Sequence, residues 1–389
     1  MTATAAPPSW RRAAFILFAV AAGTNVPTPL LLIYRERLDL GPDVLTAVFG
    51  VYAAGLVPAL FLAGPASDRL GRRGLVLWFS ALAGVTSLVF IAAASSLPLL
   101  FVGRALQGAV SGAVFSVGSA WLTELSAASG DSAAGRRAAV AMGAGFSLGP
   151  LTSGLLGEYG PWPTTLPYLV HVALVGAGLA AAWRLPETVP VAAGPSPAAG
   201  RGPLVLASDR PVLVSVLAPL AVCVYAFPAI VVAAVPLLVE TSAPPVLLTG
   251  VLAGLTLGSG ALAAPLQRRL GDRTAVVGVL SGSAGFLLAT LGAGSGSPPL
   301  LLVAAVLLGS GGGLSLAAGL GLTARIARPE RRGALSAVFY ACAYLGFAGP
   351  YVTAVVAAAT RVQVPLASAA ALTLALGLRL AVAARRGQL

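Results

Sequence analysis

Apolar stretches recur along almost the whole chain and are separated by short polar segments. An α-helix of about twenty apolar residues crosses the hydrocarbon core of a bilayer, and these stretches have that length. The chain is therefore expected to be an all-α membrane protein with twelve transmembrane helices. The pattern places them near 13–34, 44–66, 74–94, 98–122, 137–158, 165–184, 211–237, 246–267, 275–293, 298–322, 334–357 and 364–383.

One polar stretch is longer than the others and contains no apolar run that could span a membrane. It reads PETVPVAAGPSPAAGRGPLVLASDR, at residues 186–210, and is rich in Pro, Gly and Ala. Such a composition is typical of a linker. The sequence thus predicts an amino-terminal six-helix bundle at 1–185, a central cytosolic linker at 186–210 and a carboxy-terminal six-helix bundle at 211–389.

The charge of the chain comes from arginine alone. All 24 basic residues are Arg, the formal net charge is +12, and the arginines stand singly or in small groups at the ends of apolar stretches. That distribution sets membrane topology and does not build a groove for nucleic acid. With a cytosolic amino terminus, twenty arginines face the cytosol, three (Arg35, Arg37 and Arg361) face outward, and Arg104 lies within a span. We expect a multi-pass protein of the inner (plasma) membrane with both termini in the cytosol.

The two halves contain an internal repeat. A shift of 200 residues places GPASDRLGRR at 64–73 on APLQRRLGDR at 264–273, and it places Gly149-Pro150 on Gly349-Pro350. Two six-helix halves related by a parallel repeat are the layout of one class of secondary transporter. Asp68, Arg72 and Arg104 become Arg268, Asp272 and Ala304 under this shift. Gating and coupling chemistry is therefore expected in the first half.

Several motifs resemble those of the major facilitator superfamily, and specifically its twelve-helix drug/proton antiporters. The chain carries GPASDRLGRRG between the spans at 44–66 and 74–94, GRALQG in the fourth span, GAGFSLGPLTSG in the fifth and RLPET after the sixth. The resemblance implies a gating motif on the cytosolic side, made of Gly64, Asp68, Arg69, Gly71, Arg72, Arg73 and Glu124.

This motif has a physical reading as an inner latch. Gly71 permits a tight reversal, and Gly64 leaves room for a close helix approach. The resemblance suggests that Asp68 meets the amino-terminal end of the span at 334–357, while Arg72 or Arg73 pairs with Glu124. The alternative is that these charges only anchor the loop in the cytosol.

Two further residues are candidates for proton coupling. An arginine within a span is costly and is therefore a functional candidate by default. The resemblance implies that the role of Arg104 is proton coupling. A structural alternative is that Arg104 reaches the outer interface or pairs with an acid at its outer end: Glu36, Asp39 or Asp43. His171, which titrates near neutral pH when unperturbed, is the second candidate, with packing as its alternative.

The fifth span and the central cavity complete the expected site. The glycine-rich pattern with Gly145, Gly149, Pro150 and Gly154 is associated with antiporters in the family, although it also suits simple helix packing. Polar or aromatic residues within the spans are candidates to line a cavity: Asn25, Gln107, Ser111, Tyr225, Phe227, Tyr340 and Tyr344. Their aliphatic surroundings favour a small amphiphilic substrate.

The sequence lacks the residues that several other functions require. The chain has no Lys, which excludes a Walker A loop, and one His with two separated Cys forms no metal cluster. We expect no enzyme activity and no cofactor or metal. The predicted function is export of drugs or metabolites by a monomer, in exchange for protons and with alternating access. The alternatives are uptake of a small nutrient and, further away, a receptor or scaffold. The all-arginine, alanine-rich composition is typical of a bacterial protein.

Overall fold

The computed structural model describes residues 9–127, 134–189, 210–328 and 332–386, and its elements in these ranges are all helical. Ten segments are long and apolar enough to cross a membrane. One of them, Pro245–Ser295, has 51 residues and contains two separate long helices, while a further apolar helix, Leu166–Ala182, has 17 residues. The all-helical membrane architecture is therefore confirmed, whereas the count of twelve spans stays a prediction.

The chain divides into two compact units. The first comprises Met1–Leu30 and Val51–Pro197, and the second comprises Leu31–Gly50 and Ala198–Leu389. Residues 31–50 thus group with the second unit, although they precede the expected linker. The predicted bundle boundaries at 185 and 211 stay a prediction.

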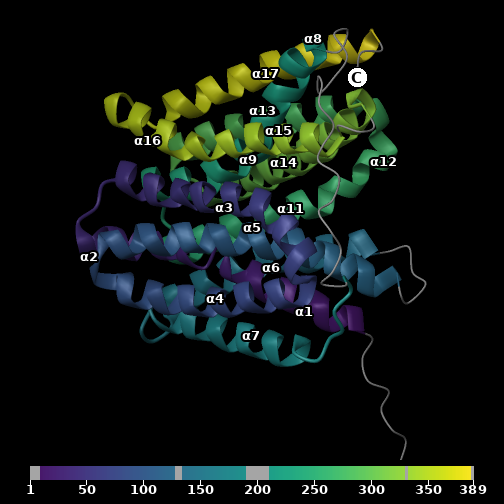
Figure 1. The fold of residues 1–389 in the computed structure, drawn as a ribbon. Helices are drawn as coiled ribbons and strands as arrows, with labels where there is room; N and C mark the ends of the chain where they lie inside the picture. The colour runs from purple at the N-terminus through teal and green to yellow at the C-terminus, as the bar shows by residue number, and fades with distance from the viewer. Residues whose placement is uncertain (1–8, 128–133, 190–209, 329–331, 387–389) are drawn as a thin grey trace, which may run out of the picture. The chain divides into compact units, whose positions relative to one another are not determined.

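The first unit is built from helices that lie alongside one another (Figure 1). Its elements are α1 (Ser9–Gly23), the beginning of α2 (Pro27–Leu38), most of α3 (Pro42–Leu70), α4 (Arg72–Ala92), η1 (Ala93–Ser95), α5 (Leu97–Ala127), α6 (Ala134–Tyr159) and α7 (Leu166–Ala182).

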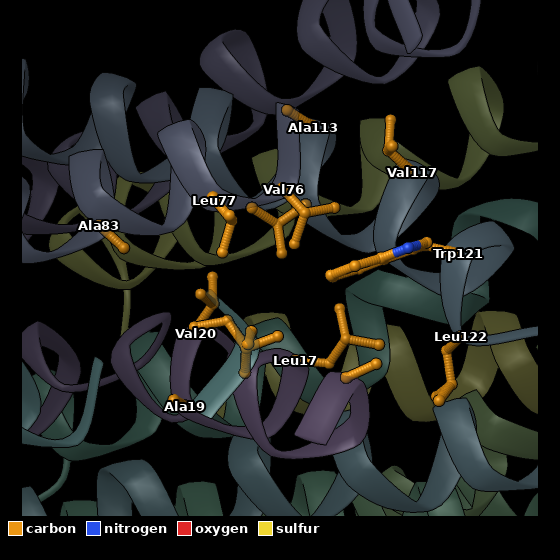
Figure 2. Close-up of a cluster of buried hydrophobic side chains, with 14 of the residues drawn as sticks. Leu17, Ala19, Val20, Val76, Leu77, Ala83, Ala113, Val117, Trp121 and Leu122 are labelled. Carbon is orange, nitrogen blue, oxygen red and sulfur yellow. The ribbon is translucent and has the colours of Figure 1, made fainter. Parts of the chain in front are cut away.

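The core of this unit lies where α1, α4 and α5 meet (Figure 2). Leu17 and Val20 of α1 point toward Val76 of α4 and Trp121 of α5, and all four side chains are almost fully buried. The Trp121 indole Nε1 donates a hydrogen bond to the carbonyl of Pro186, 3.1 Å away. This bond ties the segment after α7 to the end of α5.

Glycines bring helix backbones of the first unit into direct contact. A Cβ on Gly145 or Gly149 of α6 would overlap the backbone of α1 around Ala22. A Cβ on Gly108 or Gly112 of α5 would likewise overlap the backbone of α3. Small residues permit this close packing, which stabilises helix pairs in a membrane by van der Waals contact.

The second unit repeats this type of contact. Its later elements are α8 (Arg210–Val212), η3 (Leu213–Leu217), α9 (Ala218–Ala229), η4 (Ile230–Ala234), α10 (Val235–Leu238), α11 (Pro245–Ala263), η5 (Ala264–Leu266), α12 (Gln267–Leu270), η6 (Gly271–Arg273), α13 (Thr274–Ser295), α14 (Pro298–Ile326), α15 (Arg332–Tyr344), η8 (Leu345–Ala348), α16 (Gly349–Ala359) and α17 (Gln363–Arg385). Gly309 and Gly313 of α14 lie against the backbone of Thr256 and Gly260 of α11. In each unit, glycines therefore let the helix before the Gly71 or Gly271 turn pack closely on a later long helix.

Candidate functional site

The predicted span at 13–34 is interrupted in its middle. Helix α1 ends at Gly23, residues 24–26 form a turn, and α2 begins at Pro27. Proline has no N–H, so Pro27 and Pro29 cannot donate the helical bonds that the carbonyls of Gly23 and Asn25 would accept. These two carbonyls instead accept closer backbone N–H groups, Gly23 O from Val26 at 3.3 Å and Asn25 O from Thr28 at 3.1 Å, so GTNVPTP produces a tight turn that breaks the helix.

Side chains of α5 and α6 also donate hydrogen bonds to three carbonyls of the break. Gln107 Nε2 donates to Gly23 O at 2.7 Å, and Arg104 Nη1 donates to Thr24 O at 3.2 Å. Ser153 Oγ of α6 donates to Val26 O at 2.7 Å. Arg104 and Gln107 stand three positions apart and therefore share one face of α5. The break is accordingly held by specific hydrogen bonds.

Arg104 belongs to a buried polar cluster around this break. Its guanidinium donates to Gln107 Oε1 at 2.7 Å and lies 5.1 Å from the centre of the Tyr52 ring. Ser111 Oγ lies 3.4 Å from Thr24 Oγ1, and Ser111 also hydrogen-bonds Tyr52. Arg104 is only 2% exposed, so its side chain lies inside the unit and does not reach an outer interface. Tyr52 and Thr24 are members of the cluster that sequence reasoning missed.

His171 joins three helices of the first unit. Its Nε2 lies 3.1 Å from the carbonyl of Ala19 and donates to it, because a carbonyl only accepts. Its Nδ1 lies 2.7 Å from Ser87 Oγ of α4. A Cβ on Gly23 would fall within the His171 ring. The geometry is that of a hydrogen-bonding residue packed beside the break.

The gating motif forms an ionic network at the turn between α3 and α4. Arg72 Nη1 lies 3.1 Å from Asp68 Oδ1, and Arg72 Nε lies 3.4 Å from Glu124 Oε1. Arg72 also donates to Ser67 Oγ, which lies one turn before the end of α3. The Arg72 side chain is only 17% exposed, so these contacts are partly shielded from water. Of the two alternatives that the sequence left for Glu124, the described contact involves Arg72.

Glu187 is the main residue of this network that sequence reasoning missed. Its carboxylate accepts hydrogen bonds from the backbone N–H groups of Arg72, at 2.8 Å, and Arg73, at 2.9 Å. These are free donors at the amino terminus of α4, where a negative charge is favourable. Gly71 precedes them with a φ of 86°, and a Cβ there would also collide with the Glu187 carboxylate. Two independent constraints, the positive φ and the nearby Glu187 carboxylate, therefore favour glycine at position 71.

The remaining residues of the motif have simpler surroundings. The Arg73 guanidinium donates to the carbonyl of Trp183 and lies 6.0 Å from the centre of its ring. Arg69 is exposed. A Cβ on Gly64 would meet no heavy atom within 4 Å among the described residues. The close helix approach expected at Gly64 is therefore absent from this structure.

The second unit contains a charge-reversed counterpart of the network. Gly271 has a φ of 53°, like the positive φ of Gly71. Asp272, which the repeat aligns with Arg72, pairs with Arg325 Nη1 at 3.1 Å. Arg325 is one position beyond the residue that aligns with Glu124. The reversed charge at Asp272 is therefore matched by an opposite charge on α14, at Arg325.

The expected cavity residues separate into different surroundings. Tyr225 and Tyr344 stack with ring centres 4.9 Å apart, Tyr340 lies 6.4 Å from Tyr344, and Phe347 lies 5.2 Å from Tyr225. Phe227, by contrast, is 1% exposed and packs edge to face on Phe286, which makes it a core residue of the second unit.

The first-unit candidates lie at or near the break. Gln107 and Ser111 are buried beside it, Asn25 is half-buried within it, and Gly154 is buried one residue after the Ser153 that bonds the break. No group of three or more His, Cys, Asp or Glu residues in the described ranges could hold a metal ion.

A helical chain with ten membrane-length segments and a buried polar cluster around a broken span is a polytopic membrane protein. The family model of the Major Facilitator Superfamily matches residues 13–282. Because this match covers more than half of the chain, the protein belongs to the Major Facilitator Superfamily.

Two curated proteins match over limited regions. The uncharacterized MFS-type transporter YceJ of Bacillus subtilis (strain 168) is 32% identical over 63 residues, which is 16% of this chain and 16% of YceJ. The class D tetracycline resistance protein of Salmonella ordonez is 30% identical over 164 residues, which is 41% of this chain and 39% of that protein. The matched regions thus span less than half of either relative.

Solved structures share the fold. The peptide transporter POT in complex with sulfate matches with a TM-score of 0.81 and 15% identity, covering 99% of this chain and 96% of that chain. A variant of the nucleoside transporter NupG matches with a TM-score of 0.74 and 12% identity, covering 96% and 98%. At these identities the likeness concerns the fold alone.

Proposed function

We propose that this protein exports small amphiphilic molecules, such as drugs or metabolites, in exchange for protons. The observation that carries the proposal is the break at Thr24–Val26 with its buried polar shell. Irregular backbone at membrane depth is tolerated only where protein buries it or where it lines a water-filled cavity. In secondary transporters, discontinuous helices of this kind form substrate and coupling-ion sites.

The proposed architecture has twelve spans in two six-helix bundles, 1–185 and 211–389, joined by a cytosolic linker at 186–210. Counting α11 and α13 separately and adding α7 raises the ten membrane-length segments to twelve. The positive φ values of Gly71 and Gly271 and the glycine-mediated helix crossings in both units support the repeat. The arginine distribution supports cytosolic termini and an inner-membrane location. We further propose that the transporter acts as a monomer.

Arg104 is the proposed centre of proton coupling, with His171 as a second candidate. The fixed positive charge of Arg104 beside the break favours an anionic or polar partner at that place and disfavours a cation there. A proton or a substrate that arrives near the break, or leaves it, would change the electrostatic environment of Arg104. We propose that this change couples proton movement to substrate movement. One proton moved through about 100 mV supplies about 2.3 kcal/mol, which sustains a substrate gradient of roughly fiftyfold.

The Arg72 network and Glu124 are proposed to gate the cytosolic side. Each exposed ion pair contributes only about 0 to 1 kcal/mol, but a few kcal/mol bias a two-state transporter strongly. The fifth-span residues Gly145, Gly149, Pro150 and Gly154 are proposed to serve antiport through close packing on α1.

The proposed direction and substrate class rest on one relative and on a group of aromatic side chains. The matched relative from Salmonella ordonez is named for tetracycline resistance, which is consistent with removal of an amphiphilic antibiotic and with a role in multidrug resistance. The aromatic group of Tyr225, Tyr340, Tyr344 and Phe347 suits flat or cationic amphiphiles.

Uptake of a small nutrient is the second candidate. The structural neighbours named as peptide and nucleoside transporters favour it, because their folds match over nearly the whole chain. Export predicts accumulation of substrate in inverted vesicles with an acidic lumen, whereas uptake predicts accumulation in right-side-out vesicles.

The test uses purified protein in proteoliposomes with an imposed pH gradient and tetracycline as the first of a panel of amphiphilic amines. We expect gradient-driven accumulation that an ionophore abolishes. Arg104→Gln should abolish coupled transport, and Arg361→Gln, which removes an exposed arginine, should transport normally. Accumulation that persists without the gradient would refute proton coupling, and equal activity of the two variants would remove Arg104 from the mechanism.

A further inference from the structure

A pocket of about 350 Å³ lies in the second unit, at the turn between α12 and α13. Its polar walls come from Gln267, Arg268 and Asp272 of the turn and from Arg325 near the end of α14. None of the residues to which the proposed transport mechanism gives a role lines this pocket.

The surroundings of the pocket are strongly basic. The described segments 267–273 and 325–328 contain five arginines, at positions 268, 269, 273, 325 and 328, and one acidic residue, Asp272. Two of the arginines, Arg268 and Arg325, line the pocket itself. Guanidinium groups offer paired donors that fit the oxygens of a phosphate group.

The first unit shows what occupies the corresponding place there. The carboxylate of Glu187 accepts the backbone N–H groups of Arg72 and Arg73. The repeat aligns these positions with Asp272 and Arg273 of η6, the short turn that leads into α13. An anion therefore sits at this turn in one unit, and a pocket stands at the aligned turn in the other.

Most of the remaining lining is apolar, although Thr274 of α13 also contributes to it. Leu220 of α9 and Ala318 and Leu322 of α14 supply apolar walls, and Leu262 and Leu266 just before the turn are exposed. A basic pocket between helices at a membrane surface, with an apolar flank, suits a phospholipid headgroup. We propose that this pocket binds a phosphate group, supplied by an anionic phospholipid.

Asp272 is expected to weaken phosphate binding in this pocket. Its carboxylate pairs with the Arg325 guanidinium at 3.1 Å, so it competes with a phosphate oxygen for the same donors. Removing the carboxylate frees the guanidinium and removes a like charge from the pocket. Loss of Asp272 should therefore strengthen binding, while loss of either arginine should weaken it.

The experiment measures lipid retention on the full-length protein by native mass spectrometry after purification from vesicles of phosphatidylcholine with cardiolipin or phosphatidylglycerol. We expect about a tenfold weaker affinity for Arg268→Gln and for Arg325→Gln, the loss expected for one charged hydrogen bond. Asp272→Asn should bind several-fold more tightly. Arg385→Gln, which removes a charge from the last turn of α17, is the matched control and should bind like the wild type.

A second arm separates the two sources of phosphate. Inorganic phosphate is titrated into protein held in phosphatidylcholine alone, with thermal stability as the readout. No stabilisation at millimolar phosphate, together with lipid retention that depends on Arg268 and Arg325, supports the lipid. Stabilisation by phosphate with no lipid retention would overturn the lipid as source. Equal lipid retention in the pocket variants and the Arg385→Gln control would overturn the site.

Discussion

The break in the first span allows a quantitative test of one hydrogen bond. Gln107 Nε2 donates to Gly23 O at 2.7 Å, a carbonyl that also accepts the Val26 N–H at 3.3 Å but lacks a helical donor because residue 27 is proline, and Gln107 Oε1 accepts from Arg104. Gln107→Met keeps the length of the side chain and removes both bonds. Hydrogen bonds in membrane proteins contribute about 0.6 kcal/mol on average and up to about 1.7 kcal/mol, so we expect a loss of about 2 kcal/mol in the free energy of unfolding.

A second substitution restores the missing donor. Pro27→Ala supplies a backbone N–H four residues after Gly23, so the carbonyl gains a helical donor and depends less on Gln107. The cost of Gln107→Met should therefore fall by about 1 kcal/mol in the Pro27→Ala background, which is a coupling larger than the ~0.5 kcal/mol within which independent sites add. The free energy of unfolding is measured by titration with sodium dodecyl sulfate, followed by tryptophan fluorescence.

The control variant is Gln267→Met. Gln267 Nε2 donates to Ala317 O at 2.9 Å, but the residue four positions later, Gly321, has its own N–H. Gln267→Met should lower the free energy of unfolding by less than Gln107→Met does, and this loss should be the same with and without Pro27→Ala. A Gln107 cycle that closes to within about 0.5 kcal/mol would refute the claim that this side chain replaces the proline donor.

Three further predictions concern the first unit and its counterpart. Glu187→Gln should weaken the start of α4 by about 1 kcal/mol, seen as faster hydrogen exchange of its first amides, and unchanged exchange would contradict the cap. Gly149→Val should destabilise by about 3 kcal/mol or prevent folding through collision with α1, whereas Gly176→Val, with open space around it, should cost at most about 0.5 kcal/mol in thermal unfolding. Arg72→Gln should cost more than Arg325→Gln in the same assay, because the second pair is exposed and contributes only about 0 to 1 kcal/mol; equal costs would contradict the network.

Local pattern was sufficient to predict the helical membrane architecture, because every span needs its own run of apolar residues. The prolines of GTNVPTP were visible as well, but the partner of Gly23 O is Gln107, 84 positions away. Glu187 was missed for the same reason, since its bonds to Arg72 and Arg73 cross more than a hundred residues. Its one signal was an acidic residue in RLPET that had no assigned role.

Residue type alone was a weaker guide to surroundings. Phe227 and Tyr225 stand two positions apart and looked equivalent as cavity candidates. Half a helical turn separates their directions, so one packs in the core on Phe286 and the other stacks on Tyr344. The pairing of Asp272 with Arg325 was missed because the partner is offset by one residue from strict alignment.

The Asp272–Arg325 pair has the opposite polarity to the Arg72–Glu124 pair, and its exposure bears on how the two halves came to differ. Exchanging two charges one at a time passes through an intermediate with like charges side by side, and water screens such a clash well only at an exposed site. Asp272 and Arg325 are 70% and 59% exposed, so a duplicated half could cross that intermediate intact. Arg72 is only 17% exposed, so water would screen the same like-charge intermediate less well at its site.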